Sequence, residues 1–202
     1  GTDNDAFRAL INIGSGTLLT VYGNSSDPGR MKIEALTDVY AVDSVRVEGV
    51  AGLSLSVAET DLSTHTLSAV NLNGARLENT SGDIYVTAKT DARVNPSANL
   101  FSAGVITGGA AIATGEVTAN NQIDAENAFI KARNVNLFAG RDAFGVSNLL
   151  NGDASNLLAR GPNGLPLPLV FDTKTFDVEA NDVHPIGTAH VLVNGTSIIC
   201  DG

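Results

Sequence analysis

The sequence predicts an all-β protein folded as a right-handed parallel β-solenoid (β-helix) with irregular loop excursions. The first observation behind this prediction is a repeat, in which three nonamers place an aliphatic residue two positions before an alanine and an aspartate three positions after it. They are MKIEALTDV (31–39), IYVTAKTDA (84–92) and VNLFAGRDA (135–143). The second is that apolar residues recur with a period of two, as in half-buried strands. The third is a composition with no Trp and 21 Gly, which suits small stacked side chains joined at glycine corners.

The composition sets the size and type of the core. The chain has 202 residues, of which 43% are hydrophobic and 17% charged, so it can bury a core and is not disordered as a whole. Three Tyr and seven Phe are its only aromatic residues. A core of large aromatic side chains is therefore excluded, and one domain of stacked aliphatic and β-branched residues, or two small ones, is expected.

A second strand-like segment precedes each nonamer. These segments are INIGSGTLL (11–19), VNLNGARLE (70–78) and IDAENAFIK (123–131), and a fourth copy, VLVNGTSII, occupies 191–199. The units therefore begin at Ile11, Val70, Ile123 and Val191. Their spacing is irregular but recurrent.

Loops interrupt the repeat at two places. YGNSSDPGR (22–30) forms an insert between two strands of the first unit, and RGPNGLPLP (160–168) holds three of the six prolines, which cannot donate to a strand ladder. Residues 144–160 could add a short helical turn with Ser147 or Asp153 as its cap, although Gly152 interrupts it. We place a boundary near residue 150, with the repeat-bearing solenoid at 1–150. Residues 151–202 form a less regular continuation that holds the Pro/Gly loop and the start of a further repeat.

Two apolar stretches follow the first two nonamers. GVAGLSLSVAET (49–60) and GVITGGAAIATG (104–115) carry almost no charge, which indicates strands that are buried on both faces or covered by a neighbour.

Repeated strands without intervening helices fit a sandwich, a propeller or a solenoid. Propeller blades usually carry an aromatic signature that this chain lacks, and a sandwich, which stays the alternative, does not require a repeat. A solenoid coil of three short strands takes roughly 18–25 residues, so each unit is expected to hold two to three coils. Ile33, Val86 and Leu137 should then line one inner face.

The same register places the neighbouring residues. The alanines Ala35, Ala88 and Ala139 should sit where inner sheets come close. The residues between the aliphatic and alanine positions, which are Glu34, Thr87 and Phe138, should point outward. Phe138 then needs a cover, for which residues 144–170 are the expected source.

The segments SGDIYVTAKTDA, ITGGAAIATGEVTANN and VNLFAGRD resemble the repeats of filamentous-haemagglutinin and leukotoxin-type filamentous adhesins, which are large bacterial surface or secreted proteins. The resemblance covers roughly residues 9–143, weakens over 144–190 and returns faintly at 191–199. It implies a β-solenoid shaft outside the cell, at the cell surface or secreted, within a protein longer than this chain. The family has no catalytic residues to carry over.

We therefore expect a non-enzymatic structural or adhesive segment with no catalytic, cofactor-binding or metal site. The alternative is a β-helix module that binds or cleaves carbohydrate, although the sequence offers no reason to select two acids. Both chain ends fall beside repeat-like strands without capping helices, so we expect them to pair with more of the same chain or with another subunit. A ligand on a host or neighbouring cell is a further partner that the resemblance allows.

Charge and hydropathy exclude other partners. The net charge is −10 without a basic cluster in the sequence, which argues against nucleic acid. No run of 18 apolar residues exists, so no membrane span is expected. The chain begins with Gly1 and without a signal stretch, which suggests processing or excision from a longer protein.

Asp38, Asp91 and Asp142 hold the same place in three nonamers. Such a ladder could bind calcium, which takes oxygen ligands. Corner residues whose carboxylates bind backbone N–H groups are the favoured interpretation, and the glycine-rich nonapeptide of calcium-binding β-rolls is absent.

The remaining candidates carry little chemistry. His65, His184 and His190 lack ligand spacing. Cys200, the single cysteine, cannot form an internal disulfide and is expected to be buried and inert. The glycines of 104–115 precede no Lys-Ser/Thr pair, so they do not form a phosphate loop. Asn24, Asn79 and Asn194 begin Asn-x-Ser/Thr triplets that arise by chance in such a composition.

Overall fold

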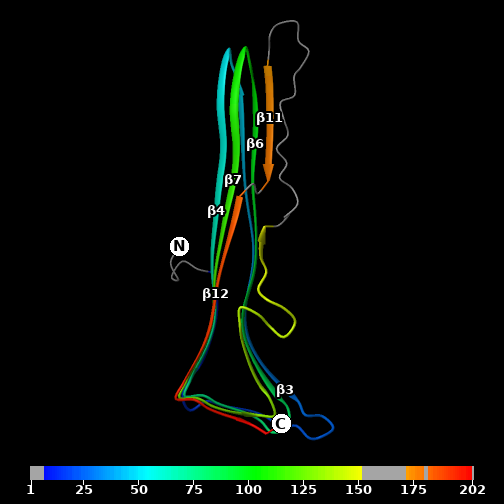
Figure 1. Cartoon of the computed structure of the whole chain (residues 1–202), viewed down its shortest axis with the longest axis vertical. Helices are drawn as coiled ribbons and strands as arrows, with labels where there is room; N and C mark the ends of the chain where they lie inside the picture. Colours follow the sequence, from blue (N-terminus) through cyan, green and yellow to red (C-terminus); the bar gives the residue numbers. More distant parts are fainter. Residues whose placement is uncertain (1–6, 152–171, 180–181, 202) are drawn as a thin grey trace.

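The computed structural model describes residues 7–151, 172–179 and 182–201, and every regular element in these ranges is a β-strand. The strands stack in parallel into three sheets, so the predicted all-β parallel solenoid is confirmed (Figure 1). Among these residues there is no helix with the length and apolarity that a membrane crossing requires.

Sheets A and B take one strand from each of the four described turns of the chain, whereas sheet C takes β3, β6 and then three shorter strands of the third turn. Sheet A has the order β1 (Phe7–Ile13), β4 (Leu53–Asn73), β7 (Ile106–Glu126) and β12 (Asp182–Asn194). Sheet B has the order β2 (Leu18–Val21), β5 (Arg76–Asn79), β8 (Phe129–Ala132) and β13 (Ser197–Cys200). In sheet C, β6 (Asp83–Gly104) pairs with β3 (Arg30–Val50), β9 (Val135–Ala139), β10 (Leu149–Asn151) and β11 (Asp172–Glu179). All of these pairs are parallel except that of β11 with β6.

One repeat unit is a single coil, so the expectation of two to three coils per unit is wrong. Ile11 pairs with Val70, Val70 with Ile123, and Ile123 with Val191, so consecutive unit starts lie on adjacent strands. The unit is long because β3, β4 and β7 each have 21 residues and β6 has 22. Strands usually have 5–6 residues, which is why a coil of short strands was expected.

The long strands give the molecule two regions (Figure 1). In the lower region, sheets A, B and C enclose a three-sided core. Above it, sheets A and C continue as a two-layer blade, because β3 turns into β4 at Ala51 and Gly52 while β6 turns into β7 at Val105. Sheet B, whose strands have four residues each, takes part only in the three-sided region.

The core of the three-sided region consists of aliphatic ladders. Ile33 pairs with Val86 and Val86 with Leu137, so the three predicted positions do stack on one inner face. The alanines two residues later, Ala35, Ala88 and Ala139, stack in the same register. Each of these ladders runs along the solenoid axis. The inward side chains of one coil therefore pack on those of the next coil, until the last coil is reached.

The blade has a core of smaller side chains. Ala58, Ala98, Leu100 and Ala113 form one buried cluster. Val39, Ala92, Val94 and Val117 form a second cluster nearer the three-sided region. Hydroxyl groups add to this interior, as Ser54 Oγ lies 2.7 Å from Ser102 Oγ.

A buried polar chain marks the junction between the two regions. Thr37 Oγ1 lies 2.8 Å from Ser68 Oγ, which in turn lies 3.2 Å from Thr90 Oγ1. Thr90 Oγ1 donates to Asn121 Oδ1 at 3.0 Å, and Asn121 Nδ2 donates to the Thr188 carbonyl at 3.4 Å. The chain therefore links sheets A and C where they converge, with its buried polar atoms paired as such groups must be.

The apolar stretches 49–60 and 104–115 are not buried on both faces. Inward residues such as Ser54, Ala58 and Ala113 are buried, but Leu53, Leu55 and Ile106 on the outer face of sheet A are 61%, 72% and 63% exposed. These stretches form the tip of the blade, where no further layer of described residues covers sheet A. The lack of charge therefore reflects an exposed apolar face.

Glu34, Thr87 and Phe138 share one outer register position, as predicted. Thr87 is nevertheless only 1% exposed, so it is not the solvent-facing site that its position predicts. The Arg141 guanidinium lies 5.2 Å from the ring centroid of Phe138 and helps to cover that ring. Part of the expected cover, residues 152–170, lies outside the described residues.

The predicted insert at 22–30 is confirmed as a loop between β2 and β3 up to Gly29. Residues 144–151 form β10 and its approach instead of a helical turn. The Pro-rich stretch 160–168 lies outside the described residues, so the boundary near residue 150 stays a prediction. The fourth copy begins as expected, with β12 and β13 extending sheets A and B.

Candidate functional site

Two of the three aspartates of the repeat meet a lysine on the outer face of sheet C. Asp38 pairs in register with Asp91, while Asp142 lies beyond the end of β9. Lys89 Nζ lies 3.3 Å from Asp91 Oδ2 and 3.2 Å from Asp142 Oδ2. Burial of Lys89 acts to lower its pKa. The hydrogen bonds to Asp142 and Asp91 and the charges of these two residues outweigh that effect, so the pKa of Lys89 is raised above its ordinary value. A protonated amine therefore lies between two of the carboxylates.

Asp142 also holds a turn. Its Oδ1 accepts hydrogen bonds from the backbone N–H groups of Phe144 at 2.7 Å and Gly145 at 2.8 Å. The bond from Phe144 N–H, with help from Gly145 N–H and Lys89, lowers the pKa of Asp142. Asp91 Oδ1 accepts from Asn148 N at 2.9 Å. These contacts favour the corner interpretation over calcium, and no group of three His, Cys, Asp or Glu in the described part of the chain is arranged to hold a metal.

The loop between β9 and β10 (residues 140–148, the β9–β10 loop) is tied to β6 along its length. Its backbone pairs with β6 at both ends, through Gly140 N to the Ala88 carbonyl at 2.9 Å and Ala92 N to the Asn148 carbonyl at 2.7 Å. Between these points Thr90 N donates to Ser147 Oγ at 3.2 Å. With the Lys89–Asp142 ion pair, these bonds fix the loop against the outer face of sheet C.

Two hollows flank this loop. The lower hollow has a volume of about 270 Å³ and is lined by Arg30, Lys32, Tyr85, Thr87, Asp142, Ala143 and Phe144. The upper hollow has a volume of about 490 Å³ and is lined by Asp38, Val39, Tyr40, Lys89, Asp91, Arg93, Val146 and Asn148. Each hollow thus combines a tyrosine with an arginine and a lysine.

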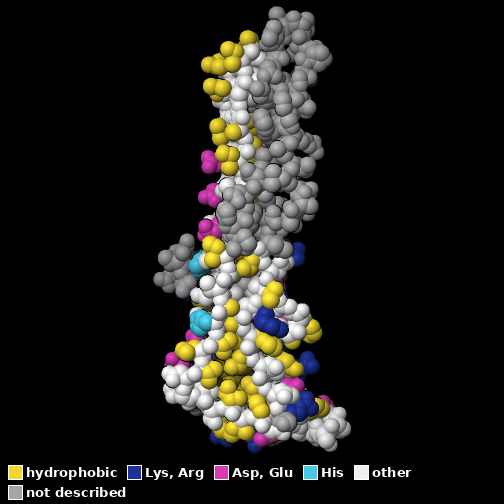
Figure 2. Space-filling view, in the orientation of Figure 1, with side chains coloured by type: hydrophobic (Ala, Val, Ile, Leu, Met, Phe, Trp, Pro, Cys, Tyr) yellow, Lys and Arg dark blue, Asp and Glu magenta, His cyan; other side chains and the backbone are white. Residues whose placement is uncertain are grey.

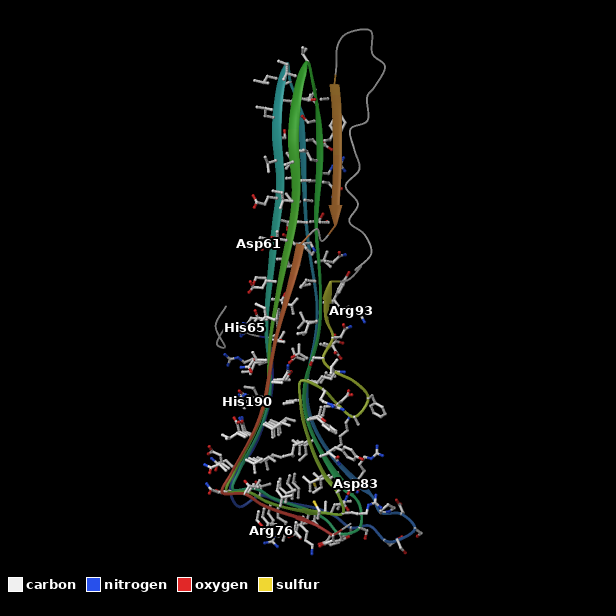
Figure 3. The ribbon with its side chains drawn as sticks, in the orientation of Figure 1. Asp61, His65, Arg76, Asp83, Arg93 and His190 are labelled. Atoms are coloured by element: carbon white, nitrogen blue, oxygen red, sulfur yellow. The ribbon has the colours of Figure 1, made fainter. Side chains whose placement is uncertain are left out.

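Figure 2 shows Lys and Arg side chains gathered over the lower half of the molecule, among hydrophobic ones. In Figure 3, Arg93 and Asp83 lie on the side of sheet C, whereas Asp61, His65 and His190 lie along sheet A. Asp83 is engaged, because its Oδ1 accepts from Arg133 Nε at 3.0 Å and from Asn134 Nδ2 at 2.9 Å. The Arg133 hydrogen bond is the main cause that lowers the pKa of Asp83.

Sequence reasoning missed these hollows because their lining comes from residues 30–40, 85–93 and 142–148. The signal was present in the repeat: aligning the first two nonamers places Lys32 beside Tyr85, and the next residues pair Tyr40 with Arg93. The contribution of Phe144 could not be found this way, because its loop breaks the register.

In the described part of the chain, the strands at both ends of the solenoid have an open edge. Within the described residues no strand pairs with the outer edges of β1, β2 and β3 at one end, or of β12 and β13 at the other. At the second end, the inward-facing Val191, Val193 and Ile198 are 42%, 45% and 40% exposed. At the first end, the inward-facing Leu19 is 37% exposed. Both ends thus combine unpaired backbone with uncovered apolar residues.

The other candidates do not come together. His190 Nε2 lies 3.2 Å from Asp124 Oδ1. His65 pairs in register with Thr118 and His190 with Gln122, four residues apart along β7, which is about 13 Å. The backbone of His184 pairs with Glu116, and its side chain lies outside the description.

Cys200 is exposed, so the prediction of a buried thiol is wrong. It occupies an inward position, in register with the buried Ala132, and is exposed because no described strand packs on β13. Asn79 is buried and caps a turn by accepting from Gly82 N at 2.9 Å. The glycine-rich stretch 104–115 runs into β7 rather than forming a phosphate loop.

No protein-family model, no curated protein and no solved structure matches the chain.

Proposed function

We propose that this chain is a non-enzymatic structural or adhesive segment of a large extracellular bacterial filamentous protein, similar in kind to the filamentous haemagglutinins. The parallel solenoid and the resemblance of its repeats support this role. So does the engagement of the repeated aspartates Asp91 and Asp142 in ion pairs and turns, which leaves them no evident catalytic part.

The observation that carries the proposal is the match between the two open ends. Extending the internal register by one coil puts a further coil, from a longer chain or from a second copy, on β12 and β13. In a second copy the strands that take these places are β1 and β2. The inward pairs across such a joint are Val191 with Ile11, Val193 with Ile13, Ile198 with Leu19, and Cys200 with Val21. Every pair is apolar or nearly so, as in the joints within the chain, and burying such surface stabilises an assembly.

Head-to-tail stacking lets sheets A and B continue together, whereas sheet C ends at β9, β10 and β11 and has no described strand in the last coil. In a two-fold contact the strands of one copy run in the opposite direction. Because the cross-section of the solenoid is a triangle with one long extension, the two copies could then pair along one sheet at most. A head-to-tail contact does not close on itself unless its rotation forms a ring, so it produces open filaments. The solenoid axis becomes the filament axis, with each blade projecting sideways.

Sedimentation at rising concentration, combined with alkylation of Cys200, tests this assembly. The thiol should become protected as copies associate, because Val21 of the next copy covers it. Val193→Glu should abolish both association and protection, since it places a charge in the joint. Leu192→Glu is the matched control, because Leu192 is 47% exposed, lies next to Val193 and points outward.

The outcomes separate the parts of the proposal. Association with a Cys200 that stays reactive would mean that copies assemble through another surface. A chain that stays monomeric at all concentrations would count against end-to-end assembly. Release of reducing ends from any polysaccharide, lost on changing one or two acids, would overturn the non-enzymatic role.

Carbohydrate binding is the second candidate function. It is favoured by the tyrosine and the basic residues in each hollow beside the β9–β10 loop.

A further inference from the structure

We propose that the outer face of sheet C, at the two hollows that flank the β9–β10 loop, binds a linear polysaccharide of uronic acids. This binding goes beyond the structural role and does not depend on assembly, because the hollows lie on the side of the solenoid.

One arginine in each hollow, Arg30 or Arg93, forms no ion pair among the described residues. Lys32 is paired with Glu34 at 2.7 Å, and Lys89 is paired with Asp91 and Asp142. Among the described residues no ion pair involves Arg30 or Arg93, whereas three other arginines each contact a carboxylate. Those three are Arg46, Arg76 and Arg133. In a chain of net charge −10, two guanidinium groups without an ion pair on one face favour an anion, even though Asp38 also lines the upper hollow. A guanidinium matches a carboxylate in a bidentate pair.

Aromatic rings stand beside both arginines. In the lower hollow the Arg30 guanidinium lies 5.3 Å from the ring centroid of Tyr85, and Phe144 at the rim is 93% exposed. In the upper hollow Tyr40 is 66% exposed and is the register partner of Arg93. Exposed aromatic rings offer a flat apolar surface with little conformational freedom to lose, as binding sites require.

The backbone of Phe144 is fixed by hydrogen bonding, although its ring is almost fully exposed and packs on few other side chains. Its own backbone N–H donates to Asp142, which is bound in turn by Lys89. A large apolar side chain on a loop fixed in this way contributes little to the core. Its position is explained by a ligand that stacks on it, because fixing the loop beforehand lowers the entropy cost of binding.

The two hollows together select a polymer of acidic rings. A volume of about 270 Å³ suits one ring-sized unit rather than a folded partner. From Tyr85 to Arg93 is eight residues along β6, or roughly 26 Å, so a chain that engages both hollows must be several sugars long. A peptide could not add as a strand to β6, since the backbone of β6 already pairs with β3 on one side and with β9 and β10 on the other. A uronic-acid polymer supplies one ring and one carboxylate per unit, which fits a site with one arginine and a tyrosine in each hollow.

Titration calorimetry with oligogalacturonates of defined length provides the test. Long oligomers should bind, and their affinity should rise once the length spans both hollows, because the second contact becomes intramolecular. The methyl ester of the same polymer, which lacks the charge, should bind at least about tenfold more weakly, and added salt should weaken binding of the acid. Poly-L-glutamate should not bind comparably, because it has carboxylates without rings.

Five variants localise the binding. Arg30→Gln and Phe144→Ala should each weaken it by about tenfold. Arg46→Gln, which removes an exposed arginine of the blade, and Tyr22→Ala, which removes another exposed ring (85%), are the matched controls and should change nothing. Asp38→Asn should strengthen binding, because it removes a carboxylate from the wall of the upper hollow.

The proposal is overturned if the acid does not bind, if its ester or poly-L-glutamate binds equally well, or if the site and control variants bind alike. An unchanged thermal midpoint of Phe144→Ala shows that its result does not come from unfolding. Loss of filament formation in Val193→Glu should leave this binding intact, which separates the two proposals.

Discussion

The three-sided region and the blade are built from the same four long strands but have different interiors. The largest fully buried side chains of the three-sided region include Leu72, Leu77 and Ile130, whereas much of the blade interior is alanine and hydroxyl side chains such as Ser54 and Ser102. Sheet B accounts for the difference. Where it is present it holds sheets A and C apart, and where it is missing the two sheets close onto small residues, because protein interiors tolerate few voids.

The outer faces of the two regions also differ, in how polar their side chains are. The three-sided region carries ion pairs such as Lys131–Asp201 and Arg133–Asp83, while the blade exposes apolar residues such as Leu55 on sheet A. The strands of sheet A therefore change the character of their outer face toward the tip of the blade, whereas β3 of sheet C keeps an ion pair there, between Arg46 and Glu48. The polar chain from Thr37 to Asn121 lies at the junction of the two regions.

The sharpest test of the comparison removes one leucine from each region. Leu72→Ala should cost about 2–5 kcal/mol of unfolding free energy, because Leu72 is fully buried in the three-sided core. Leu55→Ala, on the exposed face of the blade, should cost about 0.5 kcal/mol or less. Denaturant midpoints of the two variants measure the difference, and similar losses would mean that the blade face is covered in solution.

A smaller effect is expected from enlarging an alanine. Ala88→Leu should overpack the inner ladder and cost about 1–3 kcal/mol, since Ala88 is fully buried between aliphatic neighbours. Ala110→Leu is the control, because Ala110 lies on the exposed outer face of the blade. A neutral Ala88→Leu would show that the inner ladder of the three-sided region has spare room.

The smallest expected effect is the loss of stability when the pH is lowered. The pKa of Asp142 is lowered in the folded chain, chiefly by the Phe144 N–H and also by Gly145 and Lys89. Its stabilisation is therefore complete above the unfolded value, near 3.8, and is lost as the pH falls through the lower folded pKa. The thermal midpoint of wild type should fall more between pH 7 and pH 3 than that of Asp142→Asn. Asp27→Asn, in the exposed insert, is the control and should behave like wild type.

The repeat predicted the stacking of Ile33 on Val86 and Leu137 because the period of two fixes which residues share a face. It did not predict coil length, since a two-residue period looks the same in a strand of 6 residues and in β6, which has 22. Exposure depended on neighbours that are distant in sequence. Thr87 is buried and Cys200 exposed for this reason.

The candidate binding face was only partly accessible from the sequence. The pairing of Tyr40 with Arg93 follows from the same alignment that defines the repeat. The placement of Phe144 depends on the turn held by Asp142, which no periodicity predicts.

Sheet A contains four strands, β1, β4, β7 and β12. At about 4.8 Å between neighbouring strands, four strands advance the solenoid by roughly 19 Å. Copies stacked head to tail would therefore repeat every 19 Å or so along the filament, with a blade projecting at each repeat. Aligned fibres should diffract with a meridional reflection near 4.8 Å and a layer line near 19 Å, and the second spacing would count the coils that each copy contributes.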